Sequence, residues 1–522
     1  MRVNPSENCR RAAMEGKRSP HACGGVVVKL LLINSNSFKQ PWPVIPYGLC
    51  CVAASAEEAG HEVKFLDLCF SEHPEKEIVD TVDAFKPDVI GISVRNIDNT
   101  VALKTRFLLE DIRERIIRPC RECFGGPVLI GGPAVGINGR EMLHYFDVEY
   151  AIRGDGELAT VEFLSRLESG APFGNMSGLI IRKEGRIVSD NEPMRIEDLN
   201  ALPRVSPSRY VDVFAYSRFN SPLQIQTKRG CALRCSYCTY NRIEGCYYRL
   251  RNPSVVADEI ERLVKETGIH KVEFVDSTFN IPLSHAKAVL RELIRKELDL
   301  DLLTMGLNPG AVDGELVDLM KEAGFREVDL GVDAGCDAML KSLGKSFLKE
   351  DVLRAGELLR NRNIPVKWFL LLGAPGESRD TLRETFDTVR HAASPWDLIV
   401  IAVGMRVYNG SAVAEQVRVE EPSLAKDNFL FPVSLPEGMT IDLKELKQIA
   451  KLESFRRPNF FLFGDDEKTP LSVLAVGTAL MKVLSPHQPL WRLFILRRKI
   501  ESFIGVRRWQ ERRFRKQLAS RP

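Results

Sequence analysis

Residues 229–238 read Arg-Gly-Cys-Ala-Leu-Arg-Cys-Ser-Tyr-Cys, so Cys231, Cys235 and Cys238 are separated by three and then two residues. They follow residues 223–227, which are predicted to form a strand. Thiolates ligate iron–sulfur clusters, usually four to a cubane, so three neighbouring thiolates leave one iron without a protein ligand. An open coordination position is typical of a catalytic metal site. The motif therefore predicts a [4Fe–4S] cluster. The alternatives are a zinc site, which needs four nitrogen or sulfur ligands, and a set of packed free cysteines.

Strand-like and helical runs alternate from this motif towards the C-terminus. The predicted strands are residues 223–227, 271–275, 301–306, 327–331, 366–372 and 397–405. Helical runs lie between them at residues 254–266, 283–296, 313–323, 349–361 and 378–392. Six βα units in about 200 residues predict a partial (β/α)6 barrel over residues 222–420. The cysteine motif follows the first strand, at the edge where barrel active sites lie.

The N-terminal part of the chain predicts a second α/β domain, over residues 26–190. Its strands are predicted at residues 26–34, 62–68, 88–94, 127–131 and 149–153, with helical segments between them. This alternation indicates a doubly wound, Rossmann-like parallel sheet, whose ligands bind beyond the carboxyl ends of the strands. The candidate ligand-binding residues at those ends are Ser93, Gly131, Gly132, Gly154 and Glu157.

Three further segments complete the predicted organisation. Residues 1–25 form a polar N-terminal extension without the apolar core of a secretory signal. Residues 191–221 carry several prolines and read as a linker. Residues 421–522 form a mixed, partly helical C-terminal region, whose best apolar run, residues 469–481, is too short to cross a bilayer.

The cysteine motif resembles the hallmark of the radical S-adenosylmethionine (SAM) superfamily, C-x3-C-x2-C with an aromatic residue, here Tyr237, before the last cysteine. The resemblance covers the barrel region. It implies that the open iron of the cluster chelates the amino and carboxylate groups of SAM. Reductive cleavage of SAM then gives a 5′-deoxyadenosyl radical, for which a flavodoxin or ferredoxin would supply the electron.

Other barrel segments match the pattern of this superfamily. Residues 274–280 end the second strand, where relatives hold the SAM amino group. Residues 331–335 resemble G-x-E-S-G with Asp in place of Glu, and residues 373–377 match a strand end that lies against the adenosyl part. Residues 404–411 resemble a G-x-R-x-Y motif. The SAM-binding residues that the resemblance implies are Tyr237, Asp276, Asn280, Asp333, Gly373, Gly376 and Arg406.

The N-terminal domain is similar to the cobalamin (B12)-binding domain of class B radical SAM enzymes. The matching segments are residues 46–49, 60–63, 87–93, 129–133 and 151–157. The D-x-H-x-x-G motif of methionine-synthase-like domains is missing, and residues 34–38 contain no histidine. The resemblance therefore implies cobalamin bound without a histidine axial ligand. The alternative is a degenerate domain that only packs on the barrel.

Together these features predict a cobalamin-dependent radical SAM C-methyltransferase that acts on an unactivated carbon of a hydrophobic or natural-product substrate. The alternatives are a cyclase of the anaerobic magnesium-protoporphyrin ester type and a non-catalytic cobalamin or redox sensor. A lipid, a porphyrin and a peptide natural product all fit as small-molecule substrates.

Charge and cysteine content bear on location and partners. The net charge is +3, so the chain as a whole does not indicate nucleic-acid binding. Twelve cysteines without a secretory signal favour a reducing cytoplasm. Residues 491–522 carry eleven Lys and Arg against two acids, and the apolar residues 493, 496, 500, 503 and 504 follow a helical period. Such a helix predicts peripheral contact with the inner membrane surface, or alternatively docks its apolar stripe on the barrel and leaves its arginines solvated.

Overall fold

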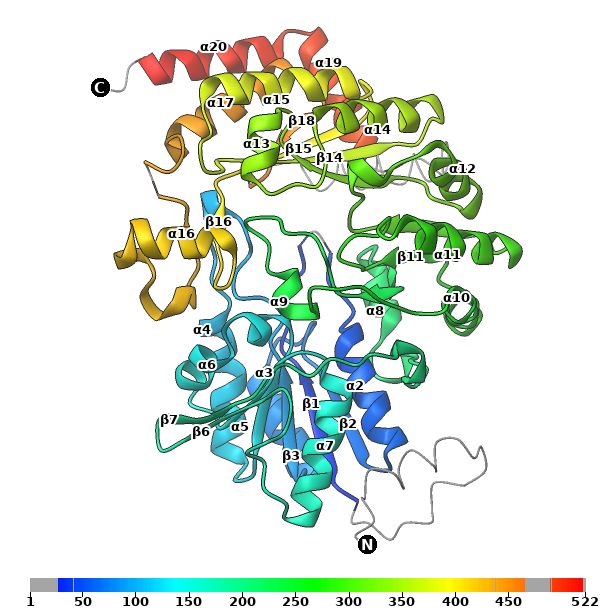
Figure 1. Cartoon of the computed structure of the whole chain (residues 1–522), viewed down its shortest axis with the longest axis vertical. Helices are drawn as coiled ribbons and strands as arrows, with labels where there is room; N and C mark the ends of the chain where they lie inside the picture. The colour runs from blue at the N-terminus through cyan, green and yellow to red at the C-terminus, as the bar shows by residue number, and fades with distance from the viewer. Residues whose placement is uncertain (1–26, 41, 437, 465–488, 490, 520–522) are drawn as a thin grey trace, which may run out of the picture.

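The computed structural model describes residues 27–40, 42–436, 438–464, 489 and 491–519. The N-terminal extension (residues 1–25) and the apolar run 469–481 lie outside these residues. Figure 1 shows two α/β units, the N-terminal sheet in blue and cyan and the barrel in green and yellow, with helices α19 (Trp491–Phe503) and α20 (Val506–Ala519) at the far end. None of the described helices has the length and apolar character needed to cross a bilayer.

The N-terminal unit is a seven-stranded sheet with the order β2-β1-β3-β4-β5-β6-β7. Strands β1 to β5 are parallel, and β6 and β7 extend the sheet as an antiparallel pair. The strands are β1 (Lys29–Asn34), β2 (Glu62–Asp67), β3 (Val89–Ser93), β4 (Val128–Gly131), β5 (Tyr150–Ile152), β6 (Leu179–Lys183) and β7 (Arg186–Asp190). Its main helices are α2 (Tyr47–Glu58), α3 (Pro74–Phe85), α4 (Leu109–Ile112), α5 (Arg118–Cys123), α6 (Pro133–Phe146) and α7 (Gly156–Ser169).

The side chains of strand β1 show that this sheet is buried on both faces. Leu31 and Ile33 belong to one apolar core, and Leu30 and Leu32 belong to the core on the opposite face. Successive side chains of a strand point to opposite faces, so a continuous apolar run is what a central parallel strand requires. The predicted doubly wound domain is confirmed.

The barrel is built from two groups of parallel strands, β12-β11-β8 and β13-β14-β15-β18. Isolated bridges from Leu302 to Phe325 and from Leu307 to Leu330 connect the two groups. The strands are β8 (Leu223–Ile225), β11 (Lys271–Phe274), β12 (Asp301–Thr304), β13 (Val328–Asp333), β14 (Val366–Leu372), β15 (Leu398–Val403) and β18 (Phe460–Leu462). The six predicted strands are present, and β18 adds a seventh from the C-terminal region, which the sequence did not indicate.

The barrel helices begin and end where local chemistry favours it. In α10 (Pro253–Thr267), the Asn252 side chain accepts a hydrogen bond from the Ser254 amide, Pro253 opens the first turn and Gly268 ends the helix in a left-handed conformation. The other helices after the linker are α9 (Tyr240–Glu244), α11 (Leu283–Arg295), α12 (Gly314–Ala323), α13 (Asp337–Ser342), α14 (Lys349–Asn361), α15 (Arg379–Ala392), α16 (Ala412–Glu420) and α17 (Leu443–Arg456).

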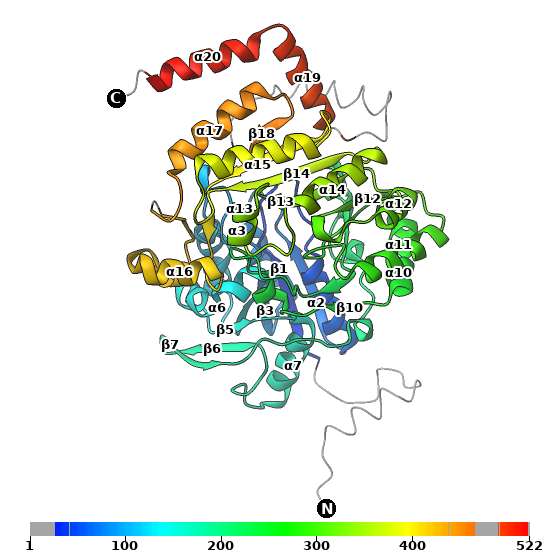
Figure 2. The same cartoon turned by 45° about the horizontal axis from the view of Figure 1, so that its top comes forward.

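The predicted linker packs against the N-terminal sheet rather than crossing open solvent. It contains helix α8 (Val213–Arg218), whose Tyr216 is fully buried and donates a hydrogen bond to Asp67 at 2.9 Å. Because Asp67 ends β2 and the linker leads into β8, this packing fixes the carboxyl edge of the sheet relative to the first barrel strand. Figure 2 shows the two α/β units from a second direction.

Candidate active site

The cysteine loop follows the short strand β9 (Lys228–Arg229), which pairs with β10 (Arg249–Leu250). Backbone hydrogen bonds shape the loop: the Cys231 amide donates to the Gly245 carbonyl at 3.0 Å, and the Ser236 amide donates to the Leu343 carbonyl at 2.9 Å. The loop is therefore held from two sides, by the segment after α9 and by the end of α13.

Two glycines make this close packing possible. Gly230 has a φ of +91°, and a Cβ atom there would lie 1.9 Å from the Tyr247 carbonyl oxygen. Gly344 has a φ of +65°, and its Cβ would lie 2.5 Å from the Arg234 carbonyl oxygen. Side chains at either position would clash with backbone, so the loop conformation requires glycine.

The three motif cysteines are free thiols in a largely buried setting. Burial raises the pKa of Cys238 to about 11 and also raises the pKa of Cys235. The thiols of Cys235 and Cys238 therefore stay protonated near neutral pH until a metal displaces the protons. Among the described residues, no three His, Cys, Asp or Glu side chains converge as the ligands of a single metal ion do. Three soft sulfur donors on one loop fit an iron–sulfur cluster, in which each thiolate takes its own iron.

A buried triad stands beside these thiols. The Tyr237 hydroxyl donates to Asp333 Oδ2 at 2.5 Å, and Lys345 Nζ donates to the Tyr237 oxygen at 3.1 Å and pairs with Asp333. Burial alone would lower the pKa of Lys345, but Asp333 and Cys235 raise it overall. The structure thus brings the predicted residues Tyr237 and Asp333 together and adds a cation, Lys345, that the sequence analysis missed. No motif marked this lysine.

Asp276 and Asn280 are placed inside the barrel wall. Asp276 Oδ2 accepts hydrogen bonds from Lys228 Nζ at 2.8 Å and from the Thr227 hydroxyl at 2.6 Å, and both ion-pair side chains are fully buried. Asn280 donates to the carbonyls of Asn308 and Ala311. Their side chains hold neighbouring loops together, and their contact with SAM stays a prediction.

The remaining SAM candidates lie at the ends of β14 and β15. The Gly373 amide donates to Glu377 Oε2 at 3.0 Å, and the Gly376 amide donates to the Met439 carbonyl at 2.9 Å. Arg406 reaches across to the N-terminal domain, where its Nη2 lies 2.7 Å from Asp98 Oδ2. Arg406 therefore joins the barrel to the loop after β3, and a role in binding SAM stays a prediction.

A cavity of about 560 Å³ lies between the carboxyl edge of the N-terminal sheet and the barrel. All five residues proposed from the sequence for cobalamin line it: Ser93, Gly131, Gly132, Gly154 and Glu157. The barrel contributes Gln224, Thr239, Tyr240, Ile243, Glu244, Val275, Met305 and Tyr408. The volume is within the range of cofactor sites.

The cavity is open at Gly48. Gly48, in the first turn of α2, lines the cavity, and no atom lies within 4 Å of the position of a Cβ there. A side chain at Gly48 would therefore occupy the cavity itself. No histidine is among the described residues that line the cavity. A corrin bound here would therefore receive no imidazole ligand from these residues.

Two further polar residues line the cavity: Glu244, which the sequence analysis missed, and Arg95, which follows a predicted strand. Burial raises the pKa of Glu244 to about 7, and its carboxylate accepts hydrogen bonds from the Gly230 amide and from Gln226, both at 3.1 Å. Arg95 lines the cavity two residues after β3, and burial lowers its pKa. In the sequence, the position of Arg95 just after a strand end marks it as a candidate ligand-binding residue. Glu244 lies on a short helix after the cysteines, and no sequence feature marks it.

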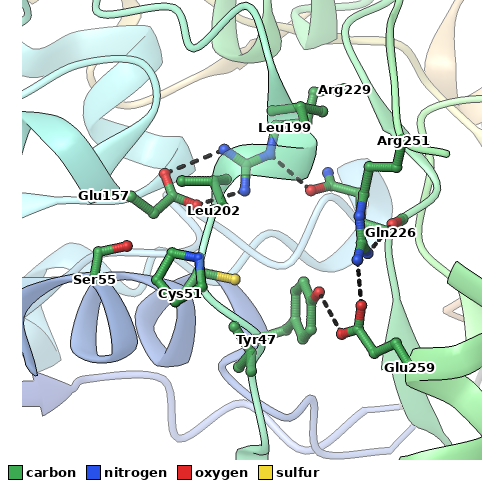
Figure 3. A pocket seen from close by; sticks show the side chains of 12 residues that line it. Tyr47, Cys51, Ser55, Glu157, Leu199, Leu202, Gln226, Arg229, Arg251 and Glu259 are labelled. Atoms are coloured by element: carbon green, nitrogen blue, oxygen red, sulfur yellow. Dashed lines mark hydrogen bonds and ion pairs between the residues drawn. The ribbon is translucent and has the colours of Figure 1, made fainter. Parts of the chain in front are cut away.

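Buried charges connect the cavity to the cysteine loop (Figure 3). Arg229 donates to Glu157 Oε1 at 2.5 Å and to Oε2 at 3.1 Å, while its Nε donates to Gln226 Oε1 at 2.9 Å. Burial alone would lower the pKa of Arg229, but Glu157 and Asp155 raise it well above its usual value. Tyr47 and Arg251 meet at Glu259 on the other side of a space of about 30 Å³, room for about one water.

The fold and the site together define an enzyme class in which a radical SAM barrel and a doubly wound, cofactor-binding domain share one cavity. Residues 225–389 match the model of the radical SAM superfamily, and residues 38–164 match that of the B12-binding domain. The chain belongs to the cobalamin-dependent radical SAM methyltransferase family. A [4Fe–4S] cluster, SAM and cobalamin are its cofactors.

Similarity to characterised proteins supports membership of this family. The radical SAM methyltransferase TsrM from Kitasatospora setae, solved with tryptophan and a SAM analogue, is 30% identical, with 75% of this chain and 76% of that chain covered and a TM-score of 0.69. Tryptophan 2-C-methyltransferase of Streptomyces laurentii is 26% identical over 68% of this chain and 69% of its own length. The anaerobic magnesium-protoporphyrin IX monomethyl ester cyclase of Rubrivivax gelatinosus is 25% identical over 76% and 71%.

Proposed function

We propose that this enzyme methylates an unactivated carbon of a hydrophobic or natural-product substrate. When bound, the cluster with SAM supplies a carbon-centred radical and cobalamin supplies the methyl group. The observation that carries the proposal is the shared cavity, which residues from the N-terminal sheet and from the segment after Cys238 line together. A substrate in this cavity can meet both cofactors without moving between sites.

The barrel side of the cavity supports an apolar substrate. Ile243, Val275 and Met305 face the cavity together with the ring of Tyr240. Such a wall excludes water from a reactive radical and binds a substrate mainly through burial of apolar surface. Glu244 is one of several polar groups on this side, and its position suits a hydrogen bond to a polar substituent of the substrate.

We also propose a flavodoxin or ferredoxin as reductant and the reducing cytoplasm as the place of action, with the basic C-terminal helices at the inner membrane surface. The cysteines of the described residues are all free thiols, which supports a reducing compartment.

The test uses anaerobically reconstituted full-length protein, loaded with iron, sulfide and hydroxocobalamin, and SAM labelled in its methyl group. Incubated with reductant and apolar candidate substrates, it is expected to give 5′-deoxyadenosine, S-adenosylhomocysteine and a labelled product. A Cys235→Ala variant is the matched control.

Two outcomes would contradict methylation. Formation of 5′-deoxyadenosine with a product that lacks the label would favour an oxidoreductase or a cyclase, and the Rubrivivax gelatinosus relative is a cyclase. Intact SAM in the presence of a reduced cluster would favour a sensor.

A further inference from the structure

Helices α19 and α20 dock on the barrel through two buried arginines. Arg498 donates to the Phe460 carbonyl at 2.5 Å, and its guanidinium lies 4.0 Å from the centre of the Phe461 ring. Arg507 donates to the Phe455 carbonyl at 3.2 Å and to the Ser454 carbonyl. Ser454 and Phe455 lie in the last turn of α17. Backbone carbonyls in the last turn of a helix have no amide donor within that helix. Arg498 and Arg507 therefore hold helices α19 and α20 in place by donating hydrogen bonds to backbone carbonyls.

The apolar stripe of the same helices faces outwards. Phe503 is 87% exposed and Trp509 is 59% exposed, and Leu496, Ile500 and Ile504 are exposed as well. In α19 only Ile495 and Arg498 are buried. The sequence analysis offered, as one of two arrangements, a helix that docks its apolar stripe on the barrel and leaves its arginines in solvent. That arrangement is wrong, because the stripe is exposed and Arg498 and Arg507 are buried. The long arginine side chains reach backbone carbonyls that short aliphatic side chains could not satisfy.

Helix α20 also carries exposed cations. Arg508, Arg512, Arg513 and Lys516 are exposed on α20, and the Arg513 guanidinium lies 5.4 Å from the centre of the Trp509 ring. The acid of this helix, Glu511, is already engaged by Arg456 and Arg515. We call the four cations together with Leu496, Ile500, Phe503, Ile504 and Trp509 the α19–α20 corner. Both views place this pair of helices at the outer end of the molecule, away from the N-terminal sheet (Figures 1 and 2).

We propose that the α19–α20 corner binds the surface of an anionic phospholipid bilayer. Aromatic and aliphatic side chains that project among arginines match the apolar boundary and the anionic headgroups of such a surface. A second copy of the chain would present the same cations and be repelled. A nucleic acid would use the cations but leave five apolar side chains in water. The proposal rests on the peripheral location proposed above and is independent of the reaction catalysed.

The experiment is co-sedimentation of the full-length, cluster-loaded protein with vesicles. One set contains phosphatidylcholine alone and the other contains phosphatidylcholine with phosphatidylglycerol. Binding is expected only to the anionic vesicles and is expected to weaken as salt rises. Phe503→Ser is expected to weaken binding roughly tenfold, the effect of withdrawing one aromatic side chain from an apolar phase. Arg508→Glu combined with Arg512→Glu is expected to weaken it at least as much.

The controls separate this surface from general loss of structure. Val419, 82% exposed on α16, is a matched apolar position, and Val419→Ser is expected to bind like the unaltered protein. Cluster absorbance and SAM cleavage with dithionite are expected to be the same in all these variants.

Several results would overturn the proposal. These are equal binding to neutral and anionic vesicles, no binding to either, or unchanged binding of Phe503→Ser. Retention by duplex DNA without vesicle binding, or a dimer that Phe503→Ser dissociates, would assign the surface to another partner. Vesicle binding without methyl transfer would leave this surface established and contradict only the proposed reaction.

Discussion

Arg229 forms a buried bidentate ion pair with Glu157, and this pair connects the residue two positions before Cys231 with the first turn of α7. One partner comes from the barrel and the other from the N-terminal domain. The cysteine loop and the wall of the shared cavity are therefore fixed relative to each other by charges that are buried away from solvent.

Replacing Glu157 by Gln leaves the Arg229 cation buried with Asp155, 3.3 Å away, as its remaining carboxylate. Loss of one partner of a buried pair costs about 3–5 kcal/mol, and Asp155 places this variant toward the lower end of that range. Urea unfolding followed by circular dichroism measures the change. The control is Glu162→Gln, which breaks a half-buried pair with Arg166, one turn away on the same helix, and is expected to cost less than about 1 kcal/mol. Equal losses in the two variants would contradict the prediction.

Cys235→Ala is expected to abolish cluster binding, because two thiolates do not hold a cubane that three are arranged to hold. The iron content, the visible absorbance and the electron paramagnetic resonance signal of the reconstituted protein measure this. Cys246→Ala is the matched control, since Cys246 is an exposed thiol eight residues after Cys238. It is expected to keep the full cluster signal; a comparable loss would mean that Cys246 is a ligand.

Lys345→Met is expected to make the cluster harder to reduce. The variant removes a cation that interacts with Cys235 and leaves the Asp333 carboxylate beside the thiols. Net charge near a cluster sets its potential, so a fall of about 60 mV is expected, equivalent to about 1.4 kcal/mol. Potentiometric titration monitored by electron paramagnetic resonance measures it. Lys345→Arg keeps the charge and is expected to keep the potential, whereas equal shifts in both variants would show that packing is responsible.

Glu244 is expected to make cofactor-free protein less stable as pH rises. Burial raises its folded-state pKa from 4.5 to about 7, so the unfolded chain releases this proton at a lower pH than the folded protein does. Stability therefore falls between about pH 4.5 and about pH 7 and loses no more from this group above that window. Glu244→Gln is expected to be more stable than the parent by roughly 2–3 kcal/mol at about pH 8, and about equal to it near pH 5. Urea unfolding at the two pH values tests this, and a difference that does not change with pH would contradict it.

Gly48→Leu is expected to block cobalamin while sparing the cluster. The new side chain would occupy the cavity, because nothing lies within 4 Å of a Cβ at Gly48. Hydroxocobalamin affinity, followed by corrinoid absorbance, is expected to fall at least about tenfold. Gly174 is equally open but lies outside the cavity, so Gly174→Leu is the control. Unchanged affinity in Gly48→Leu would place the corrin elsewhere.

The features that the sequence predicted are those set by short-range pattern. Cys231, Cys235 and Cys238 are close in the chain, so their spacing alone indicates a common metal site. Ser93, Gly131 and Glu157 are far apart in the chain, but the topology of a parallel sheet brings its carboxyl ends to one edge. The doubly wound sheet and the six barrel strands were predictable for the same reason.

What the sequence missed depends on long-range partners. The sequence did not reveal that Lys228 pairs with the Asp276 carboxylate, and contact of Asp276 with SAM stays a prediction. Arg406 pairs with Asp98, more than 300 positions earlier in the chain. The helical period near the C-terminus identified an apolar stripe, but not which face is buried, because that depends on the carbonyls that end α17.

Strand β18 lies at the edge of the barrel sheet, paired in parallel with β15 although about sixty residues separate them along the chain. During synthesis on the ribosome, β15 emerges well before its neighbour and presents an unpaired strand edge to the surrounding medium. Unpaired edges of this kind invite association with other nascent chains. Expression of the barrel alone, cut at residue 420, would make this temporary exposure permanent, so a productive truncation has to retain the segment through Leu462.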